Sequence, residues 1–218
     1  MNVGYKQNSR YDLFDLILSF QPTQVVEFGA YDGATLTNLS QKHENCLYVA
    51  VDNDSMALSQ IQSSDISKIH DDLDQPNNKK YAYLIEEDAV TVVLLLDVLE
   101  HLRSPEVFMD WLKENFLSNT VAIISVPNVR NWRTFYELLK GDWPQNEYGL
   151  FDRTHLHFFT AKSFWRRFKF SGKLLSFKYR YSKNSYLKML QFAAPSVLCG
   201  QMTFVIRIGD LLSNDKAA

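Results

Sequence analysis

Four apolar runs of strand length recur along the first part of the chain, and they constrain its fold more than any other feature. Most of their residues are β-branched or aliphatic, without the regular polar alternation of a half-exposed strand, and this is typical of parallel strands covered on both faces. The runs are Gln24–Phe28, Cys46–Val51, Thr91–Leu96 and Thr120–Val126. Segments with helical spacing separate them, so the alternation predicts an α/β fold with a doubly wound, mainly parallel sheet.

The segments between the runs carry helix signals. Residues 11–20 place apolar side chains at the spacing of one helix face, and Pro22 ends that segment. Ser104 and Pro105 provide an N-cap and a first-turn proline for a later helix. Further helices are expected over residues 34–43, 55–63 and 161–170, and further strands over residues 68–73, 174–181 and 202–208. Residues 130–160 are aromatic-rich, and irregular structure is expected there; residues 213–218 are expected to be frayed.

Composition narrows the class of protein. A chain of 218 residues with 46% hydrophobic residues is long enough to bury a sizeable core within one domain. The net charge of −2 gives no general attraction to nucleic acid or to a membrane surface. Residues 162–188 are basic and contain no acid, which indicates either a solvated face or a positive wall facing an anionic substrate.

The two cysteines and the apolar segments indicate in which cellular compartment the protein is expected. Cys46 and Cys199 form neither a disulfide framework nor a metal-ligand pattern, which favours a reducing, cytoplasmic setting. Cys46 opens an apolar run and is expected to be buried as a small hydrophobe. The N-terminus lacks an apolar signal segment, and the most apolar run is too short to span a bilayer.

Acidic residues stand at the ends of the predicted strands. Glu27, Asp52 and Asp97 close three of them, and the carboxyl ends of parallel strands form the rim where such sheets bind ligands. Gly29 and Gly33 follow the first strand and allow a sharp turn that a nucleotide-like ligand approaches closely. Asp52 is well placed for the two hydroxyls of a ribose, because a carboxylate offers only acceptors.

Four segments carry a resemblance to a known family. They are E-F-G-A-Y-D-G at 27–33, Y-V-A-V-D at 48–52, D-V-L-E-H-L-R-S-P at 97–105, and G-L-F-D-R-T-H-L-H-F-F-T at 149–160. With them the chain resembles the class I S-adenosylmethionine-dependent methyltransferases, in particular the ubiquinone-type branch. The last segment is similar to a marker of a subgroup that includes many small-molecule and glycan-associated methyltransferases. The resemblance covers nearly the whole chain.

This resemblance implies a Rossmann-like sheet of seven strands with an antiparallel last strand, and S-adenosylmethionine as cofactor. It implies one methyltransferase domain over residues 1–218, with residues 129–160 as a substrate lid or insertion. The implied cofactor-binding residues are Glu27, Gly29, Ala30 and Gly33 around the methionine end, Asp52 and Asn53 at the ribose, Asp72 and Leu73 at the adenine, and Asp97 and Val98 near the sulfonium. Tyr31 stands where the family usually has a second glycine.

Methyl transfer to a hydroxyl requires alignment of the acceptor and removal of its proton. Histidine suits the second task because its pKa lies near neutrality, so His155 is the leading candidate for a catalytic base and His101 the second. His155 and His157 alternate in sequence, but no third ligand has convincing spacing, so no metal site is expected.

The expected function is O-methylation of a small-molecule or sugar-type acceptor. A non-catalytic, cofactor-binding domain stays open because Tyr31 interrupts the glycine motif. An NAD-dependent oxidoreductase is a weaker alternative: Asp52 would suit its ribose, but the G-x-G-x-x-G pattern is missing. No strong nucleic-acid signal and no membrane span are present, and the oligomeric state is not indicated.

Overall fold

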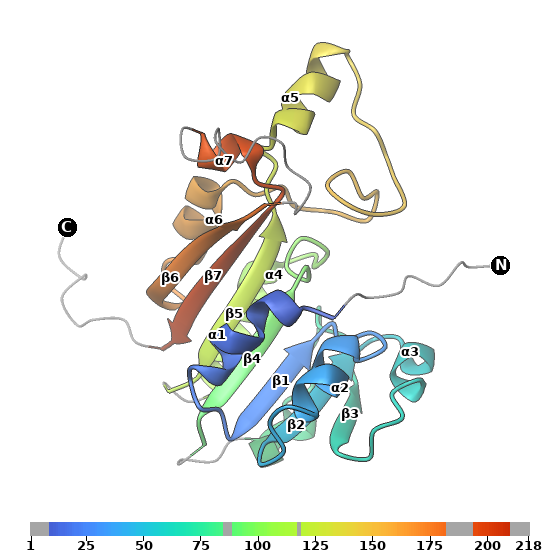
Figure 1. Ribbon diagram of the computed structural model, residues 1–218, viewed down its shortest axis with the longest axis vertical. Coiled ribbons are helices and arrows are strands. Elements are labelled where there is room, and N and C mark those ends of the chain that lie inside the picture. Colours follow the sequence, from blue (N-terminus) through green and yellow to red (C-terminus); the bar gives the residue numbers. More distant parts are fainter. Residues whose placement is uncertain (1–8, 85–88, 117–118, 182–193, 210–218) are drawn as a thin grey trace.

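The computed structural model describes residues 9–84, 89–116, 119–181 and 194–209, and a seven-stranded sheet runs through it in the order β3-β2-β1-β4-β5-β7-β6 (Figure 1). The strands are β1 Gln24–Phe28, β2 Leu47–Asp52, β3 Ile66–His70, β4 Thr91–Leu96, β5 Val121–Pro127, β6 Gly172–Arg180 and β7 Gln201–Ile208. The pairs among β1 to β5 are parallel, whereas β7 runs antiparallel to both β5 and β6. The expected mainly parallel sheet with an antiparallel last strand is confirmed.

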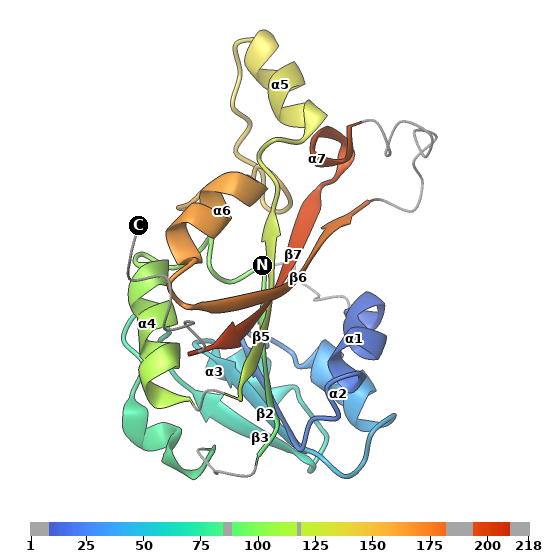
Figure 2. The ribbon, with the colours of Figure 1, turned by 90° about the vertical axis from the view of Figure 1, so that its left-hand side faces the viewer.

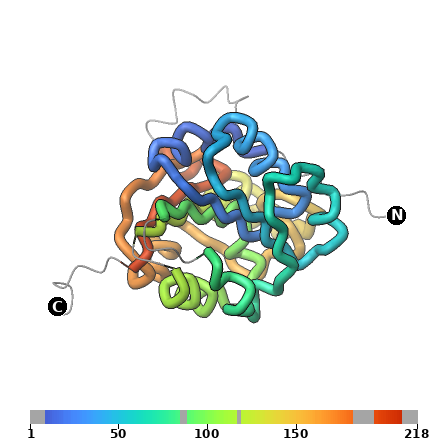
Figure 3. The backbone as a smooth tube through the Cα atoms, turned by 90° about the horizontal axis from the view of Figure 1, so that it is seen from below, coloured from blue at the N-terminus to red at the C-terminus, as the bar shows by residue number. Residues whose placement is uncertain are grey.

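Helices cover both faces of this sheet, as Figures 2 and 3 show. The α-helices are α1 Phe14–Leu18, α2 Ala34–Ser40, α3 Ser55–Ser59, α4 Pro105–Asn115, α5 Trp132–Leu139, α6 Ala161–Phe168 and α7 Pro195–Leu198. Short 3-10 helices lie at η1 Tyr11–Leu13, η2 Asn78–Lys80 and η3 Ala82–Leu84. Buried residues of α1, α2 and α3 form one apolar cluster with the sheet, and those of α4 and α6 form a second. The sheet therefore lies in the middle of three layers.

Burial explains why the strands read as continuous apolar runs. Every residue of β1 and β4 is buried, as expected for central parallel strands. Phe28 shows how one strand face is covered: its ring contacts the rings of Tyr81, Phe108 and Trp111 at centroid distances of 5.8, 5.3 and 6.0 Å. These contacts fix α4 and the segment before β4 against the end of β1.

Several expected elements differ in the structure, and helices α2 and α3 end at Ser40 and Ser59 rather than at residues 43 and 63. The strand expected over residues 68–73 lies at Ile66–His70 and stops before Asp71. The Asp71 side chain is buried and accepts hydrogen bonds from the Asn77 N–H and the Tyr81 hydroxyl, so the chain turns there. Residues expected to be irregular form α5, where the Asn131 side chain caps the helix by accepting from the Arg133 N–H.

Cys46 is only half-buried, because the chain reaches the covered part of β2 at Tyr48 rather than at its first residues. Residues 213–218, for which fraying was expected, lie outside the described residues. Within the described ranges, none of the helices combines the length and the apolar character that crossing a bilayer requires.

Backbone hydrogen bonds to β2 hold the turn between β1 and α2 in place. The Gly29 and Ala30 N–H groups both donate to the Val51 carbonyl, at 2.8 and 3.0 Å. Gly29 has a φ of +72°, and a Cβ there would lie 2.6 Å from Val98 Cγ2. Gly33 has a φ of +66°, and a Cβ there would lie 2.6 Å from Ile61 Cδ1. Left-handed backbone and close packing thus both favour glycine at these two positions.

One acid is enclosed by this turn. Glu27 is fully buried in β1, and in the described part of the chain neither of its carboxylate oxygens has a hydrogen-bond partner. Burial raises the pKa of Glu27 to about 8, although the Arg10 guanidinium opposes the shift. At neutral pH the folded protein therefore holds this side chain mostly in its uncharged form.

We expect Gly29→Ala to destabilise the protein by roughly 2–4 kcal/mol, because a left-handed φ and a side-chain clash are combined there. Gly141→Ala is the matched control, since Gly141 has a φ of +78° but no atom within 4 Å of an added Cβ. Its expected loss is about 1 kcal/mol. Urea unfolding followed by circular dichroism measures both, and equal losses would show that packing against Val98 does not matter.

We expect Glu27→Gln to stabilise the cofactor-free protein at pH 8 by roughly 2–4 kcal/mol. The folded pKa of about 8 lies above the unfolded value, so between about pH 4.5 and 8 the folded state binds more protons, and its stability falls as pH rises. Glutamine does not titrate, so the variant lacks this fall and its advantage disappears near pH 4. Denaturant unfolding across this pH range is the measurement; parallel pH profiles for the two proteins would contradict the burial argument.

Candidate functional site

The carboxyl ends of β1, β2 and β4 bring the predicted acids to one rim. Phe28 at the end of β1 is in register with Val51 of β2 and Leu95 of β4, so Asp52 and Asp97 follow on either side of the glycine turn. The sequence prediction of a shared rim therefore matches the strand register.

Asp52 holds the glycine turn in place. Its carboxylate accepts hydrogen bonds from the Tyr31 N–H at 2.7 Å and from the Asp54 N–H at 2.9 Å. A carboxylate has about four acceptor positions, so two remain for a ligand. Tyr31 has a φ of +48°, and this hydrogen bond helps to hold the unusual backbone. Asn53 is exposed, and its carbonyl lies 3.0 Å from His70 Nε2.

The two acids after β3 have different environments. Asp71 is buried and pairs with Lys80 Nζ at 2.7 Å as well as with the Tyr81 hydroxyl at 2.7 Å, so its role is structural. The Asp72 side chain is exposed, and within the described residues its carboxylate accepts a hydrogen bond from the Asp74 N–H alone. Leu73 beside it is buried. Of the two carboxylates, Asp72 is the one that is open to a ligand.

Asp97 lies in a polar network that the sequence did not reveal. Its carboxylate accepts from Gln201 Nε2 at 2.5 and 2.6 Å and from Ser125 Oγ at 3.2 Å. The buried Arg10 guanidinium donates to Ser125 Oγ at 2.9 Å and lies 4.0 Å from Asp97. These partners come from the N-terminal segment, β5 and β7, so only the folded sheet brings them together. Val98, the next residue, is buried against Gly29.

Some of the basic side chains of residues 162–188 form ion pairs within the molecule. Arg167 pairs with Glu106 and lies over the Phe159 ring. Arg180 pairs with Asp12 at 3.1 Å and donates to Gln201. The stretch is therefore not a uniform positive wall in its described part, and residues 183 and 188 lie outside it.

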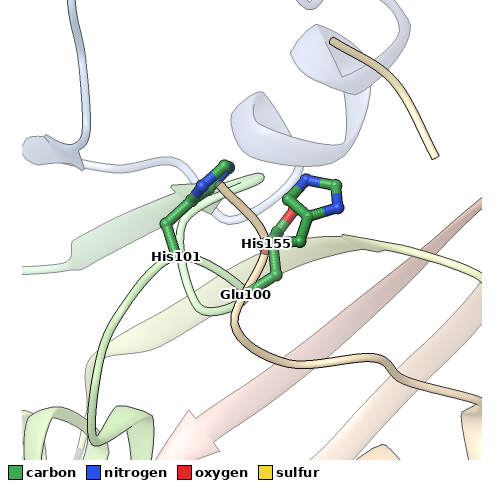
Figure 4. A group of neighbouring side chains, drawn as sticks. All are labelled: Glu100, His101 and His155. Carbon is green, nitrogen blue, oxygen red and sulfur yellow. The ribbon is translucent and has the colours of Figure 1, made fainter. Parts of the chain in front are cut away.

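The segment after α5 returns to the rim through the backbone carbonyl of Glu100. That oxygen accepts from the Leu156 N–H at 2.8 Å and from the His157 N–H at 3.1 Å. The contact places His155 beside His101, with ring centroids 4.8 Å apart (Figure 4). The two predicted catalytic histidines, which are far apart in sequence, are thus neighbours.

Hydrogen bonding fixes the His101 ring. The Thr154 hydroxyl lies 2.6 Å from Asp152 Oδ1 and 3.0 Å from His101 Nδ1. An ionised Asp152 carboxylate can only accept, so Thr154 donates to it and accepts from the Nδ1–H of His101. In the neutral ring, Nε2 of His101 then carries the free lone pair.

Glu100 completes this cluster with a buried carboxylate. Both of its oxygens lack a hydrogen-bond partner within the described ranges. Burial, and then the Asp97 carboxylate, raise the pKa of Glu100 well above its ordinary value. Burial, and then His101, lower the pKa of the half-buried His155. One potential ligand atom from each of Glu100, His101 and His155 lies within 4.8 Å of the others.

His157 does not join His155 in a shared site. Its Nδ1 lies 3.1 Å from the Arg167 guanidinium, which can only donate, so Nε2 carries the proton and faces the Arg103 carbonyl at 3.3 Å. His157 therefore braces the returning segment. The partner that sequence spacing missed for His155 is Glu100, whose position beside His101 in D-V-L-E-H was the available signal.

Comparison with known proteins identifies the family and the fold of this chain. A family model described as a methyltransferase domain matches residues 5–172. An S-adenosylmethionine-dependent methyltransferase from Archaeoglobus fulgidus superposes with a TM-score of 0.61 at 12% identity, over 90% of this chain and 91% of that one. No curated protein matches the sequence significantly.

Two further similar structures contain S-adenosylhomocysteine (SAH). The plantazolicin methyltransferase BamL, in complex with a triazolic desmethylPZN analog and SAH, has a TM-score of 0.60 at 14% identity, over 90% of this chain and 84% of that one. The 1,6-didemethyltoxoflavin-N1-methyltransferase of Burkholderia thailandensis was solved with 1,6-didemethyltoxoflavin and S-adenosylhomocysteine bound. It has a TM-score of 0.59 at 12% identity, over 92% of this chain and 78% of that one. At these identities the likeness shows the fold.

The family match covers most of the chain and decides between the functions that the sequence left open. It favours methyl transfer over an NAD-dependent oxidoreductase and over a domain without activity. The chain belongs to the methyltransferase-domain family and is an S-adenosylmethionine-dependent methyltransferase.

Proposed function

We propose that this enzyme methylates a hydroxyl oxygen of a small-molecule or sugar-type acceptor. The observation that carries the proposal is the pair of neighbouring rings of His101 and His155 at the rim, with Nε2 of His101 left as an acceptor. As the new C–O bond forms and the C–S bond breaks, the hydroxyl must lose its proton. Imidazole nitrogens at this place are the groups best suited to act on that proton near neutral pH.

The rim offers a donor and acceptor set that fits the cofactor. Asp52 keeps two acceptor positions for the ribose hydroxyls, and Asp72 with the apolar Leu73 would border the adenine. The backbone of the turn, which has no Cβ at Gly29, and the Asp97 carboxylate would face the methionine end. When bound, the cofactor supplies a methyl group on a positively charged sulfur.

Other residues of the predicted set would support cofactor binding by shaping the loop and its packing. Glu27 is enclosed beneath the turn and would orient the loop. We propose that the rest of the set contributes through backbone and packing: Ala30 and Gly33 through the turn, Asn53 at the exposed end of β2, and Val98 against Gly29.

Residues 129–160 are proposed as the lid over the acceptor, within one methyltransferase domain of residues 1–218. In Figure 1 α5 extends beyond the carboxyl end of β5. The segment exposes large apolar side chains, and the Leu156 and His157 N–H groups tie its returning part to the Glu100 carbonyl at the rim. Aromatic surfaces of this kind suit the faces of rings and sugars. The exposed large apolar side chains of this segment are Trp132, Phe135, Tyr136, Leu138, Leu139, Tyr148, Leu156 and Phe158.

The acceptor class also rests on the resemblance to the ubiquinone-type, small-molecule branch, through the D-V-L-E-H and D-R-T-H-x-x-F-F-T segments. BamL and the toxoflavin methyltransferase were solved with small acceptors, so the fold accommodates molecules of that size. The choice of oxygen rests on the histidine pair of this chain.

A panel of phenols, catechols, sugars and amines, incubated with enzyme and cofactor carrying a labelled methyl group, tests the proposal. We expect label in an ether linkage on one hydroxyl class and none on the amines. In parallel calorimetry we expect binding of S-adenosylmethionine and its demethylated product but not of NAD. Label on nitrogen or carbon alone would overturn the proposed acceptor.

We expect His155→Ala to lower turnover by roughly 10²- to 10⁴-fold while leaving the affinity for S-adenosylhomocysteine unchanged, because its ring acts on the acceptor side. His43→Ala is the matched control: His43 Nε2 lies 3.1 Å from the Pro22 carbonyl, at the entry to β1 and away from the rim. Steady-state kinetics and calorimetry separate the two effects. Unchanged turnover in His155→Ala would remove this residue from the reaction.

A further inference from the structure

We propose that Glu100, His101 and His155 bind a divalent transition-metal ion. A potential ligand atom of each lies within 4.8 Å of the other two, and Figure 4 shows the three side chains gathered where the returning segment meets the chain after β4. Small side-chain rotations would bring two nitrogens and one oxygen to the spacing of a metal site, where bonds are about 2.0–2.2 Å long.

The buried Glu100 carboxylate is a second and independent observation. It is 0% exposed, and within the described ranges neither of its carboxylate oxygens has a hydrogen-bond partner. A buried carboxylate without partners is costly unless a cation or a proton compensates it. Asp97 and Asp152 both lie close enough to act on it electrostatically, so the surroundings favour an added positive charge.

His101 is already oriented as a ligand. Its Nδ1–H is held by Thr154, and Thr154 by Asp152, so Nε2 keeps a free lone pair. Metal-binding histidines commonly donate their other ring N–H to such an outer partner, which fixes the tautomer and the ring plane. The Asp152–Thr154 pair supplies this support without touching the ion.

The ligand types indicate the class of ion. Two imidazoles and one carboxylate suit zinc, iron, cobalt or manganese better than magnesium or calcium, which prefer oxygen ligands only. Three protein ligands also leave at least one coordination position open, as in catalytic rather than structural sites.

The role of this ion rests on the proposed function. An acceptor hydroxyl at the open position would lose its proton more easily, because a bound cation stabilises the oxygen anion. In that case His101 and His155 act on the hydroxyl through the ion they hold, and this replaces direct removal of the proton by a free imidazole nitrogen. The proton leaves to solvent as the methyl group moves from sulfur to oxygen.

Cobalt and zinc titrations of the full chain, stripped with a chelator and free of cofactor and acceptor, test the site itself. We expect one equivalent of Co²⁺ to bind and to show the visible absorption bands of a cobalt ion with a low coordination number. We expect Zn²⁺ to displace it. Glu100→Gln and His101→Ala should weaken binding at least 10-fold, and Asp152→Asn by about 10- to 100-fold through the loss of outer support. His43→Ala should bind as the unaltered protein does.

Absence of a bound equivalent, or equal affinity in His101→Ala and the unaltered protein, would overturn the site. If Glu100→Gln does not fold, His101→Ala and Asp152→Asn still decide the question. Methyl transfer that stops with chelator and returns with metal would support the role at the acceptor. Full transfer in chelator would overturn that role while leaving the methyltransferase proposal intact.

Discussion

The backbone carbonyl of Glu100 is the contact on which the candidate site depends. By accepting the N–H groups of Leu156 and His157, it attaches the segment after α5 to the chain that leaves β4. This attachment places His155 beside His101, while the side chain of Glu100 itself turns into the interior. One residue therefore supplies both the anchor of the returning segment and the buried carboxylate of the cluster.

Several energetically unfavourable features, namely buried acids and left-handed backbone, also lie at the rim. Glu27 and Glu100 are buried acids without hydrogen-bond partners in the described ranges, and Tyr31 and Asp97 have left-handed backbone at φ +48° and +58°. Each such feature costs of the order of 1–3 kcal/mol and persists only where the surrounding structure enforces it. Their gathering at the carboxyl ends of buried parallel strands is typical of a site kept for function rather than for stability.

Much of this architecture could be predicted from the sequence. The continuous apolar runs identified the central strands, because burial on both faces leaves no polar alternation, and Asp52 and Asp97 marked the rim on which the cofactor prediction was built. Other features required the folded chain. Arg10, Ser125 and Gln201 meet around Asp97 only through the order of the sheet. Helix α5 was missed although its apolar residues at 132, 135, 136 and 139 have helical spacing. In the structure this apolar face is exposed rather than packed on the core, so burial against the sheet does not account for the helix.

A crystal structure with S-adenosylhomocysteine would test the central claim most directly, that the rim binds the cofactor and presents its methyl group to the histidine cluster. The account predicts the ribose at Asp52, the adenine beside Asp72 and Leu73, and the sulfur facing Glu100, His101 and His155. A cofactor bound away from Asp52, or with its sulfur turned away from that cluster, would contradict it.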